Sequence, residues 1–147
     1  MIFLLDLNLL LALAWPSHVH HEPAHAWFER EAASGWATCP LTQLGFVRLS
    51  SNTAFSSDAV SPTTALSLLQ DITDMDGHEF WSDDVDCVSV PFSRDVQLTG
   101  HRQVTDAYLL LLARARSGCL ATLDRRVGWL VPRHLRPNPH LRIVEAH

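Results

Sequence analysis

A long apolar stretch in the last third of the chain predicts a buried helix. Residues 109–113 are apolar on every side, so this helix is expected to pack into a core rather than lie on the surface. Thr105 is the predicted N-cap, and Asp106 falls in the first helical turn. Ser117 and Gly118 are expected to end the helix, because glycine tolerates the left-handed conformation that is common at helix ends.

Two short apolar runs, far apart in the sequence, predict buried strands that each end at a carboxylate. Cys119–Leu123 is typical of a central parallel strand and is followed by Asp124. Ile2–Leu5 is a similar run that ends at Asp6. The carboxyl ends of parallel strands meet at one edge of a sheet, where open α/β proteins bind ligands. We therefore expect Asp6 and Asp124 to lie at the same edge as Asp106.

The rest of the chain alternates short strands with helices. This alternation predicts a single α/β domain with a mainly parallel sheet. Residues 51–61 and 127–139 are expected to be loops, the second with one helical turn, and residues 88–92 fit a strand or a loop. The further strands are predicted at residues 36–39, 78–81 (an edge strand) and 141–144, and the further helices at residues 8–14, 21–33, 41–50 and 62–74.

The helical periodicity also predicts which side chains face the core. In the helix over 21–33 these are Ala24, Trp27 and Phe28, with the stem of Glu31. In the helix over 41–50 they are Leu44, Phe46 and Val47, and in the helix over 62–74 they are Leu66, Leu69 and Ile72.

Composition narrows the class of protein. A chain of 147 residues that is 47% hydrophobic suits one domain with its own core. A net charge of −5 argues against nucleic-acid binding by bulk charge alone. All 11 basic residues are arginine, which suits bidentate phosphate contacts, although a GC-rich coding bias gives the same count.

Neither a signal peptide nor a membrane span is expected. The apolar N-terminus carries Asp6 and has no basic segment before it, and no apolar run is long enough to cross a bilayer. Cys39, Cys87 and Cys119 lie far apart, so we expect reduced, buried thiols of a cytoplasmic protein rather than disulfides or a zinc site.

Asp6, Asp106 and Asp124 form the candidate chemical centre. Carboxylates at this spacing would repel one another, and a divalent cation would remove the conflict. Mg²⁺ or Mn²⁺ prefers such oxygen ligands and can activate water toward a phosphodiester. Taken singly, Asp6 could be only a helix cap, Asp106 a first-turn acid stabilised by the helix dipole, and Asp124 a turn residue.

Three segments together carry a resemblance to a known family. LLDLNLLLAL, CPLTQLGFVRL and VTDAYLLLLARARSGCLATLDRR resemble PIN-domain ribonucleases, specifically the VapC toxins of VapBC toxin–antitoxin pairs. The resemblance implies a PIN-like three-layer α/β/α sandwich and a Mg²⁺- or Mn²⁺-dependent endoribonuclease that leaves 5′-phosphate and 3′-hydroxyl ends. It also implies a usually dimeric protein, neutralised by a cognate VapB-like antitoxin that covers the early helices and reaches the acidic pocket. By position, Asp6, Asp106 and Asp124 match the metal-binding acids.

Gln43 is the departure from the family pattern. Relatives commonly carry Glu at this position of the helix after the second strand, whereas this chain has PLTQLGF. An amide oxygen can still bind a metal, but it brings no charge and cannot act as a base. We expect an active site with weaker metal binding in the absence of RNA.

Several further side chains are candidates for RNA contact. Arg48, Arg125 and Arg126 could bind phosphate, or could instead be solvated or ion-paired. Asn8 could hold Asp6 or a metal-bound water, or simply cap a helix. The tryptophans are expected in the core or at a dimer contact, with an exposed Trp15 or Trp81 able to stack a base.

The segment His21-Glu22-Pro23-Ala24-His25 matches the zinc-protease motif H-E-x-x-H. That motif needs both histidines on one face of an established helix, whereas Pro23 places this one at a helix entry, and no third ligand is marked. We interpret both histidines, together with His18 and His20, as loop residues that are exposed or near a substrate.

Two other functions fit the same residues. A non-catalytic PIN-like protein could bind RNA or a partner after losing turnover through Gln43. A different α/β phosphoryl-transfer hydrolase, such as a phosphatase, would form an aspartyl-phosphate on Asp6, but Asn8 and Leu10 stand where a D-x-D-x-T motif needs Asp and Thr.

Overall fold

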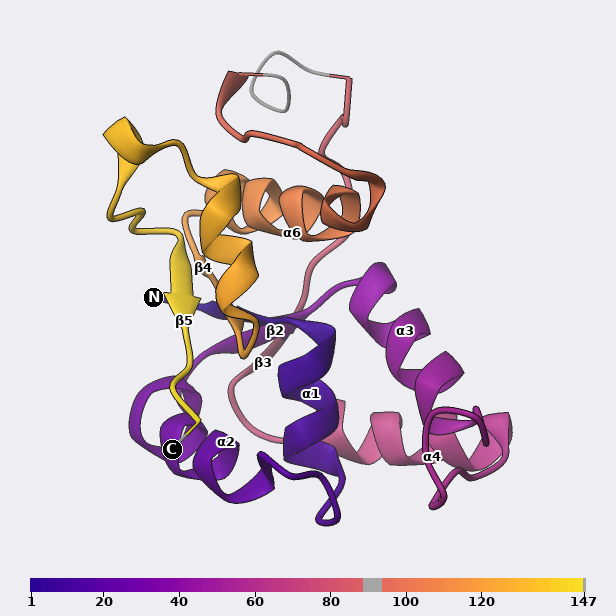
Figure 1. Ribbon diagram of the computed structural model, residues 1–147. Helices are drawn as coiled ribbons and strands as arrows, with labels where there is room; N and C mark the ends of the chain where they lie inside the picture. The colour runs from indigo at the N-terminus through magenta and orange to yellow at the C-terminus, as the bar shows by residue number, and fades with distance from the viewer. Residues whose placement is uncertain (89–93, 147) are drawn as a thin grey trace.

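The computed structural model describes residues 1–88 and 94–146 and confirms an α/β fold. Five strands, all paired in parallel, form one sheet in the order β3-β2-β1-β4-β5 (Figure 1). The strands are β1 (Phe3–Leu5), β2 (Trp36–Thr38), β3 (His78–Phe80), β4 (Cys119–Thr122) and β5 (Leu141–Ile143).

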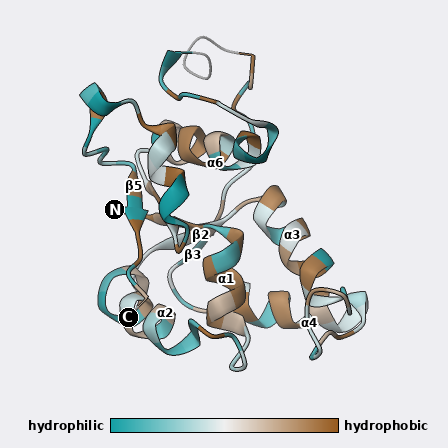
Figure 2. Cartoon of the chain, viewed as in Figure 1, coloured by the Kyte–Doolittle hydropathy of each residue, from teal (hydrophilic) through white to brown (hydrophobic). Residues whose placement is uncertain are grey.

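Helices cover both faces of the sheet. Leu4 packs on the same side as α6 (Val104–Ala115), while its neighbours Phe3 and Leu5 pack on the opposite side. Figure 1 shows α6 on one side of the sheet, and Figure 2 shows that α6 is hydrophobic along most of its length. The predicted three-layer α/β/α sandwich is therefore confirmed. The opposite layer is formed by α1 (Leu7–Ala14), α2 (His21–Trp27), α3 (Pro40–Ser50) and α4 (Pro62–Thr73).

The centre of the sheet is the point where the strand order reverses. Strand β1 lies between β2 and β4, and its Leu5 pairs with Ala121 of β4. From β1 the chain proceeds outward through β2 and β3, whereas β4 and β5 extend the sheet on the other side. A crevice at the carboxyl ends of the strands, at such a switch point, is the usual ligand site of open α/β sheets.

Most predicted elements are present, with differences at their ends. The helix expected over 21–33 is α-helical only to Trp27 and continues as a π-helical turn, η1 (Phe28–Ala32). The expected 127–139 loop contains 3-10 turns, η3 (Arg125–Leu130) and η4 (Arg133–Leu135). The strand or loop expected over 88–92 lies outside the described residues, apart from the exposed Val88.

Two leucines predicted to face the core are instead exposed. Leu44 in α3 is 60% exposed and Leu66 in α4 is 56% exposed, while Phe46 is fully buried. The inward stripe of α3 runs through Thr42, Gly45, Phe46 and Ser50, so small and polar side chains stand where the pattern suggested leucine. In α4 the buried positions are Ala65 and Leu69. The predictions of Phe46 and Val47 in α3 and of Leu69 and Ile72 in α4 are confirmed, since these side chains are buried in the core or packed against it.

The ends of α6 also differ from the prediction. Thr105 lies inside the helix, which begins at Val104 directly after a 3-10 turn, η2 (His101–Gln103). The left-handed residue beyond its C-terminus is Ser117, with φ of 54°, rather than Gly118. Gly118 is needed for space, because a Cβ there would lie 2.5 Å from the Trp81 ring and 2.7 Å from the Ile2 carbonyl oxygen.

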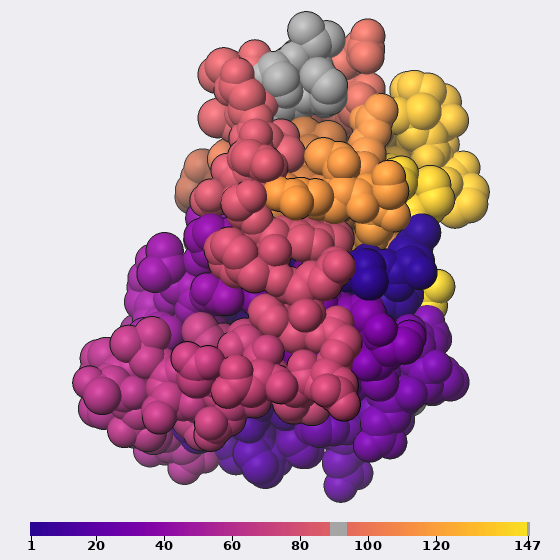
Figure 3. Space-filling model, turned by 180° about the vertical axis from the view of Figure 1, so that it is seen from behind, coloured from indigo at the N-terminus to yellow at the C-terminus, as the bar shows by residue number. Residues whose placement is uncertain are grey.

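Seen from behind, the surface is formed largely by α4 and by the segment that contains β3 (Figure 3).

Cys39 and Cys119 are buried, but Cys87 is exposed, so the expectation of three buried thiols is wrong for Cys87. Within the described residues, no helix combines the length and hydrophobicity needed to cross a membrane.

Candidate metal-dependent nuclease site

Asp6 stands at the end of β1, in the centre of the sheet. It is 5% exposed and caps α1, accepting a hydrogen bond of 2.7 Å from the Leu7 amide through Oδ1. Its other oxygen, Oδ2, accepts a 2.6 Å hydrogen bond from the Thr122 hydroxyl. Burial raises the pKa of Asp6, although these two hydrogen bonds lower it and so offset part of the rise.

Thr122 connects the acids and was not predicted from the sequence. Its hydroxyl lies at the end of β4, fully buried, and has one proton, which the short distance assigns to Asp6. The same oxygen accepts hydrogen bonds from Asn8 Nδ2 at 3.3 Å and from the Asp124 amide at 3.1 Å. Asn8 also accepts one from the Leu123 amide at 3.2 Å, so its side chain ties α1 to the end of β4.

Asp106 enters the site from the first turn of α6. Its carboxylate makes no hydrogen bond or ion pair within the described part of the chain, and it is half-buried. Burial, followed by the nearby charges of Asp6 and Asp124, raises the pKa of Asp106 to about 6. This crowding of negative charge is the feature that a divalent cation would relieve.

Asp124 is held by Arg126. The guanidinium donates through Nε to Oδ1 at 3.0 Å and through Nη2 to Oδ2 at 2.9 Å, and the Arg126 amide adds a third hydrogen bond at 2.9 Å. Hydrogen bonding to Arg126 keeps the pKa of Asp124 below its usual range. Asp124 thus stays ionised while Asp106 holds its proton to higher pH.

The three acids share one open hollow of about 590 Å³. The donor chemistry fits Mg²⁺ or Mn²⁺, since all three groups offer hard oxygen atoms and their charges crowd one another. As the side chains stand, however, no three His, Cys, Asp or Glu residues among those described form a ready cage for a metal ion. Thr122 holds Asp6, and Arg126 holds Asp124, through hydrogen bonds within the chain. Asn8, His18, His20, Phe55 and Arg126 also line the hollow.

Gln43 lies near the start of α3, beside the end of β2. Its amide nitrogen donates to the Thr38 hydroxyl at 3.0 Å, and Thr38 also contacts His78 Nε2 at 2.8 Å. Gln43 does not line the hollow that contains the three acids. Its role toward a metal stays a prediction.

The other predicted contacts are distributed around the molecule. Arg126 lies at the hollow, whereas Arg125 pairs with Glu145 at 3.3 Å. Arg48 is exposed on α3 and does not line the hollow. Trp81 is buried and cannot stack a base from solvent, while the half-buried Trp15 donates to Ser50 at 3.0 Å.

The H-E-x-x-H histidines have a structural role. His21 Nδ1 lies 2.8 Å from the Ala12 carbonyl and His25 Nε2 lies 3.0 Å from the Leu13 carbonyl, both in the last turn of α1. Those carbonyls lack helical partners, and because a carbonyl only accepts, each ring nitrogen must donate. The interpretation of both as loop residues is wrong: they begin and continue α2 and cap the C-terminus of α1.

Fold and site together define a three-layer α/β domain with three carboxylates lining one hollow at the switch point of the sheet, the place where open α/β enzymes bind ligands. No family model matches the chain. Three ribonucleases of Mycobacterium tuberculosis do: VapC38 is 48% identical over 125 residues, VapC44 43% over 125 and VapC39 42% over 121. These matches cover 84%, 85% and 82% of this chain and 86%, 87% and 87% of the relatives.

The chain therefore belongs to the VapC ribonuclease family. A solved structure described as VapBC2 from Rickettsia felis bound to a DNA fragment from its promoter shares the fold, with a TM-score of 0.60. That likeness covers 99% of this chain and 100% of the other at 12% identity.

Proposed function

We propose that this chain is a Mg²⁺- or Mn²⁺-dependent endoribonuclease and the toxin of a VapBC-type pair. The observation that carries the proposal is the convergence of Asp6, Asp106 and Asp124 on one hollow at the switch point of the sheet. When bound there, a divalent cation would activate water and stabilise the leaving oxygen of the phosphodiester. Family membership supplies the substrate class, RNA.

The residues of the chain itself have distinct tasks in this proposal. Thr122 holds Asp6 in one orientation through a 2.6 Å hydrogen bond, so this carboxylate is positioned before substrate arrives. Arg126 offers a planar guanidinium that suits phosphate as well as carboxylate. Transfer of Arg126 from Asp124 to an incoming RNA phosphate would free the Asp124 oxygens at the moment they are needed.

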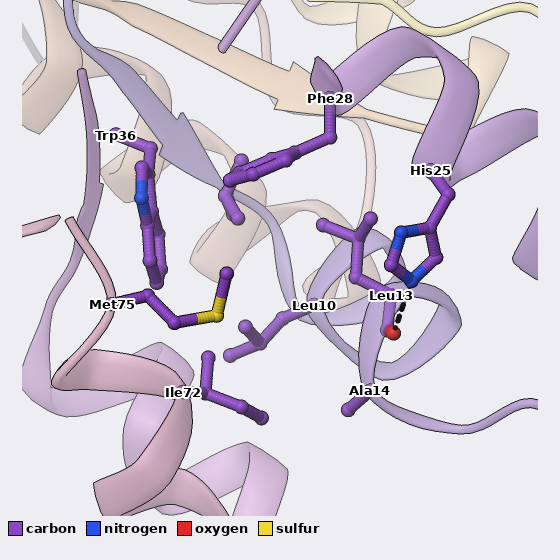
Figure 4. Close-up of a pocket in the computed structure, with 9 residues that line it drawn as sticks. Leu10, Leu13, Ala14, His25, Phe28, Trp36, Ile72 and Met75 are labelled. Atoms are coloured by element: carbon purple, nitrogen blue, oxygen red, sulfur yellow. Dashed lines mark hydrogen bonds between the residues drawn. The ribbon is translucent and has the colours of Figure 1, made fainter. Parts of the chain in front are cut away.

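A VapB-like antitoxin is the proposed protein partner, as the pairing named for the Rickettsia felis complex suggests. An apolar cavity of about 70 Å³ lies between α1, α2 with η1, and α4, and could seat an apolar side chain of that partner. Figure 4 shows Phe28, Trp36, Ile72 and Met75 pointing toward its centre. Relief of toxicity by the product of a neighbouring small gene would support this pairing. A homodimer and a cytoplasmic location stay proposals.

Expression in a bacterial host tests the proposal. Induction of the wild-type chain should stop growth and degrade cellular RNA, whereas Asp6→Asn should be tolerated at the same protein level. Asp71→Asn, an exposed acid on α4, is the matched control and should remain toxic. Growth arrest by Asp6→Asn equal to that of the wild type would contradict the assignment and favour a non-catalytic protein.

A further inference from the structure

A second hollow of about 260 Å³ adjoins the acidic one. The two hollows share Asp106, Asp124 and Arg126, so whatever fills the second lies directly beside the proposed centre. Its other wall is formed by Arg102 of η2 and Trp129 of η3.

Trp129 is unusual among the tryptophans of the chain. It is 61% exposed, whereas Trp27, Trp36 and Trp81 are buried. Large aromatic side chains usually gain free energy by leaving water, so an exposed indole at a functional cleft indicates a surface that a ligand covers.

The backbone holds Trp129 in place although its side chain faces solvent. The Trp129 carbonyl accepts a 2.7 Å hydrogen bond from Gln97 Nε2, and the adjacent Leu130 is buried. Next to it, a Cβ on Gly128 would meet nothing within 4 Å beyond its chain neighbours, so this side of the turn faces open space. The exposed indole is therefore presented from an anchored turn.

The chemistry of the wall fits one nucleotide. An indole face stacks any base, and the exposed guanidinium of Arg102 suits a phosphate. The first hollow is lined in addition by Phe55, which is 52% exposed, and by His18 and His20. An RNA strand that spans both hollows would thus meet an aromatic ring in each.

We propose that the second hollow is a nucleotide subsite, in which Trp129 stacks an unpaired base next to the phosphate at the acidic site. Arg102 contacts the backbone of that nucleotide. The proposal rests on the proposed ribonuclease function and narrows its substrate to RNA that is single-stranded around the cut. A duplex keeps its bases stacked on one another and cannot place one on the indole.

Binding in EDTA tests the subsite separately from cleavage. With a mixed-sequence single-stranded oligoribonucleotide, Trp129→Ala should bind about tenfold more weakly than wild type, since one stacked base contributes about that factor. Trp129→Tyr should stay within about threefold, because it keeps an aromatic face. Arg102→Ala should reduce the salt dependence of binding by about one phosphate contact. Phe80→Ala removes an exposed ring from edge strand β3 and should bind like wild type.

Cleavage of the same RNA gives the second readout. We expect Trp129→Ala to raise KM by about tenfold and to leave kcat within about twofold, as expected for a residue that positions substrate. RNA should also quench the indole fluorescence of the wild type but not that of Trp129→Phe.

Several results would overturn the subsite. These are wild-type binding and cleavage by Trp129→Ala, an equal loss in Phe80→Ala, or a change of oligomeric state in Trp129→Ala without any change in RNA affinity. The last result would mean that the indole covers a second copy of the chain. If the wild type cleaves no RNA but Trp129 still controls binding, the proposed function fails and the subsite stands.

Discussion

Asp106 should make the stability of the metal-free protein depend on pH. Its pKa is raised from 3.8 to about 6 by burial and by Asp6 and Asp124, and at about 1.4 kcal/mol per pKa unit this corresponds to roughly 3 kcal/mol. Because the carboxylate is only half-buried, solvent screening reduces the effect to about 1–2 kcal/mol.

The sign follows from where the proton is bound. Folded Asp106 keeps its proton to higher pH than the unfolded chain does, so this group stabilises the fold at low pH. That contribution is lost as the pH rises from about 4 through about 6. Asparagine cannot titrate, so Asp106→Asn should be more stable than wild type by about 1–2 kcal/mol above pH 7 and nearly equal to it near pH 4.

Urea denaturation of both forms in EDTA, at pH 4.5 and pH 7.5, measures this difference. Excess Mg²⁺ at pH 7.5 should narrow the gap, because the proposed cation would stabilise the form with all three acids more than Asp106→Asn. Asp71→Asn serves as the exposed control and should show no pH-dependent gap. A gap of equal size at both pH values, or a less stable Asp106→Asn at pH 7.5, would show that the charge of Asp106 does not destabilise the fold.

Three further changes probe the surroundings of the site. Thr122→Val should lower the free energy of unfolding by about 2 kcal/mol and slow RNA cleavage at least tenfold, because Asp6 loses a charge-assisted hydrogen bond; denaturation curves and initial rates check this. Changing His21 and His25 together to Ala should cost about 1–2 kcal/mol in melting experiments without altering zinc binding, and a zinc-dependent loss of activity would reopen the metal interpretation. Gln43→Glu should tighten Mg²⁺ or Mn²⁺ binding by calorimetry through its added charge, and equal or weaker binding would place residue 43 outside the metal site.

The fold could be predicted because the strongest signals are local and agree with one another. Apolar runs of strand length alternate with helical segments, and each of the two central runs ends at an acid, Asp6 or Asp124. The predicted strand ends and helix start were enough to place these two acids and Asp106 close together. In the structure all three acids line one hollow. Leu44 was wrongly placed in the core, because the inward stripe of α3 contains Thr42 and Ser50 beside Phe46.

Side-chain partners across the sheet could not be predicted from the sequence. Thr122 stands in the run LATLD, where it is hard to distinguish from an ordinary strand residue, and its partner Asp6 is 116 positions away. The role of His21 and His25 in the H-E-x-x-H segment was missed for a similar reason, because the partners of both rings are carbonyls of another helix, α1. The ion pair of Asp124 with Arg126 depends on the geometry of the turn after β4.

Asp6 and its neighbours are proposed to cleave RNA with the help of a divalent cation. The most direct measurement incubates the purified chain with single-stranded RNA in EDTA, and again after Mg²⁺ or Mn²⁺ is added, beside Asp6→Asn and Asp71→Asn. New 5′-phosphate ends should appear only with the cation, and only for wild type and Asp71→Asn. Cleavage in EDTA, or equal cleavage by Asp6→Asn, would rule out a metal-dependent role for Asp6.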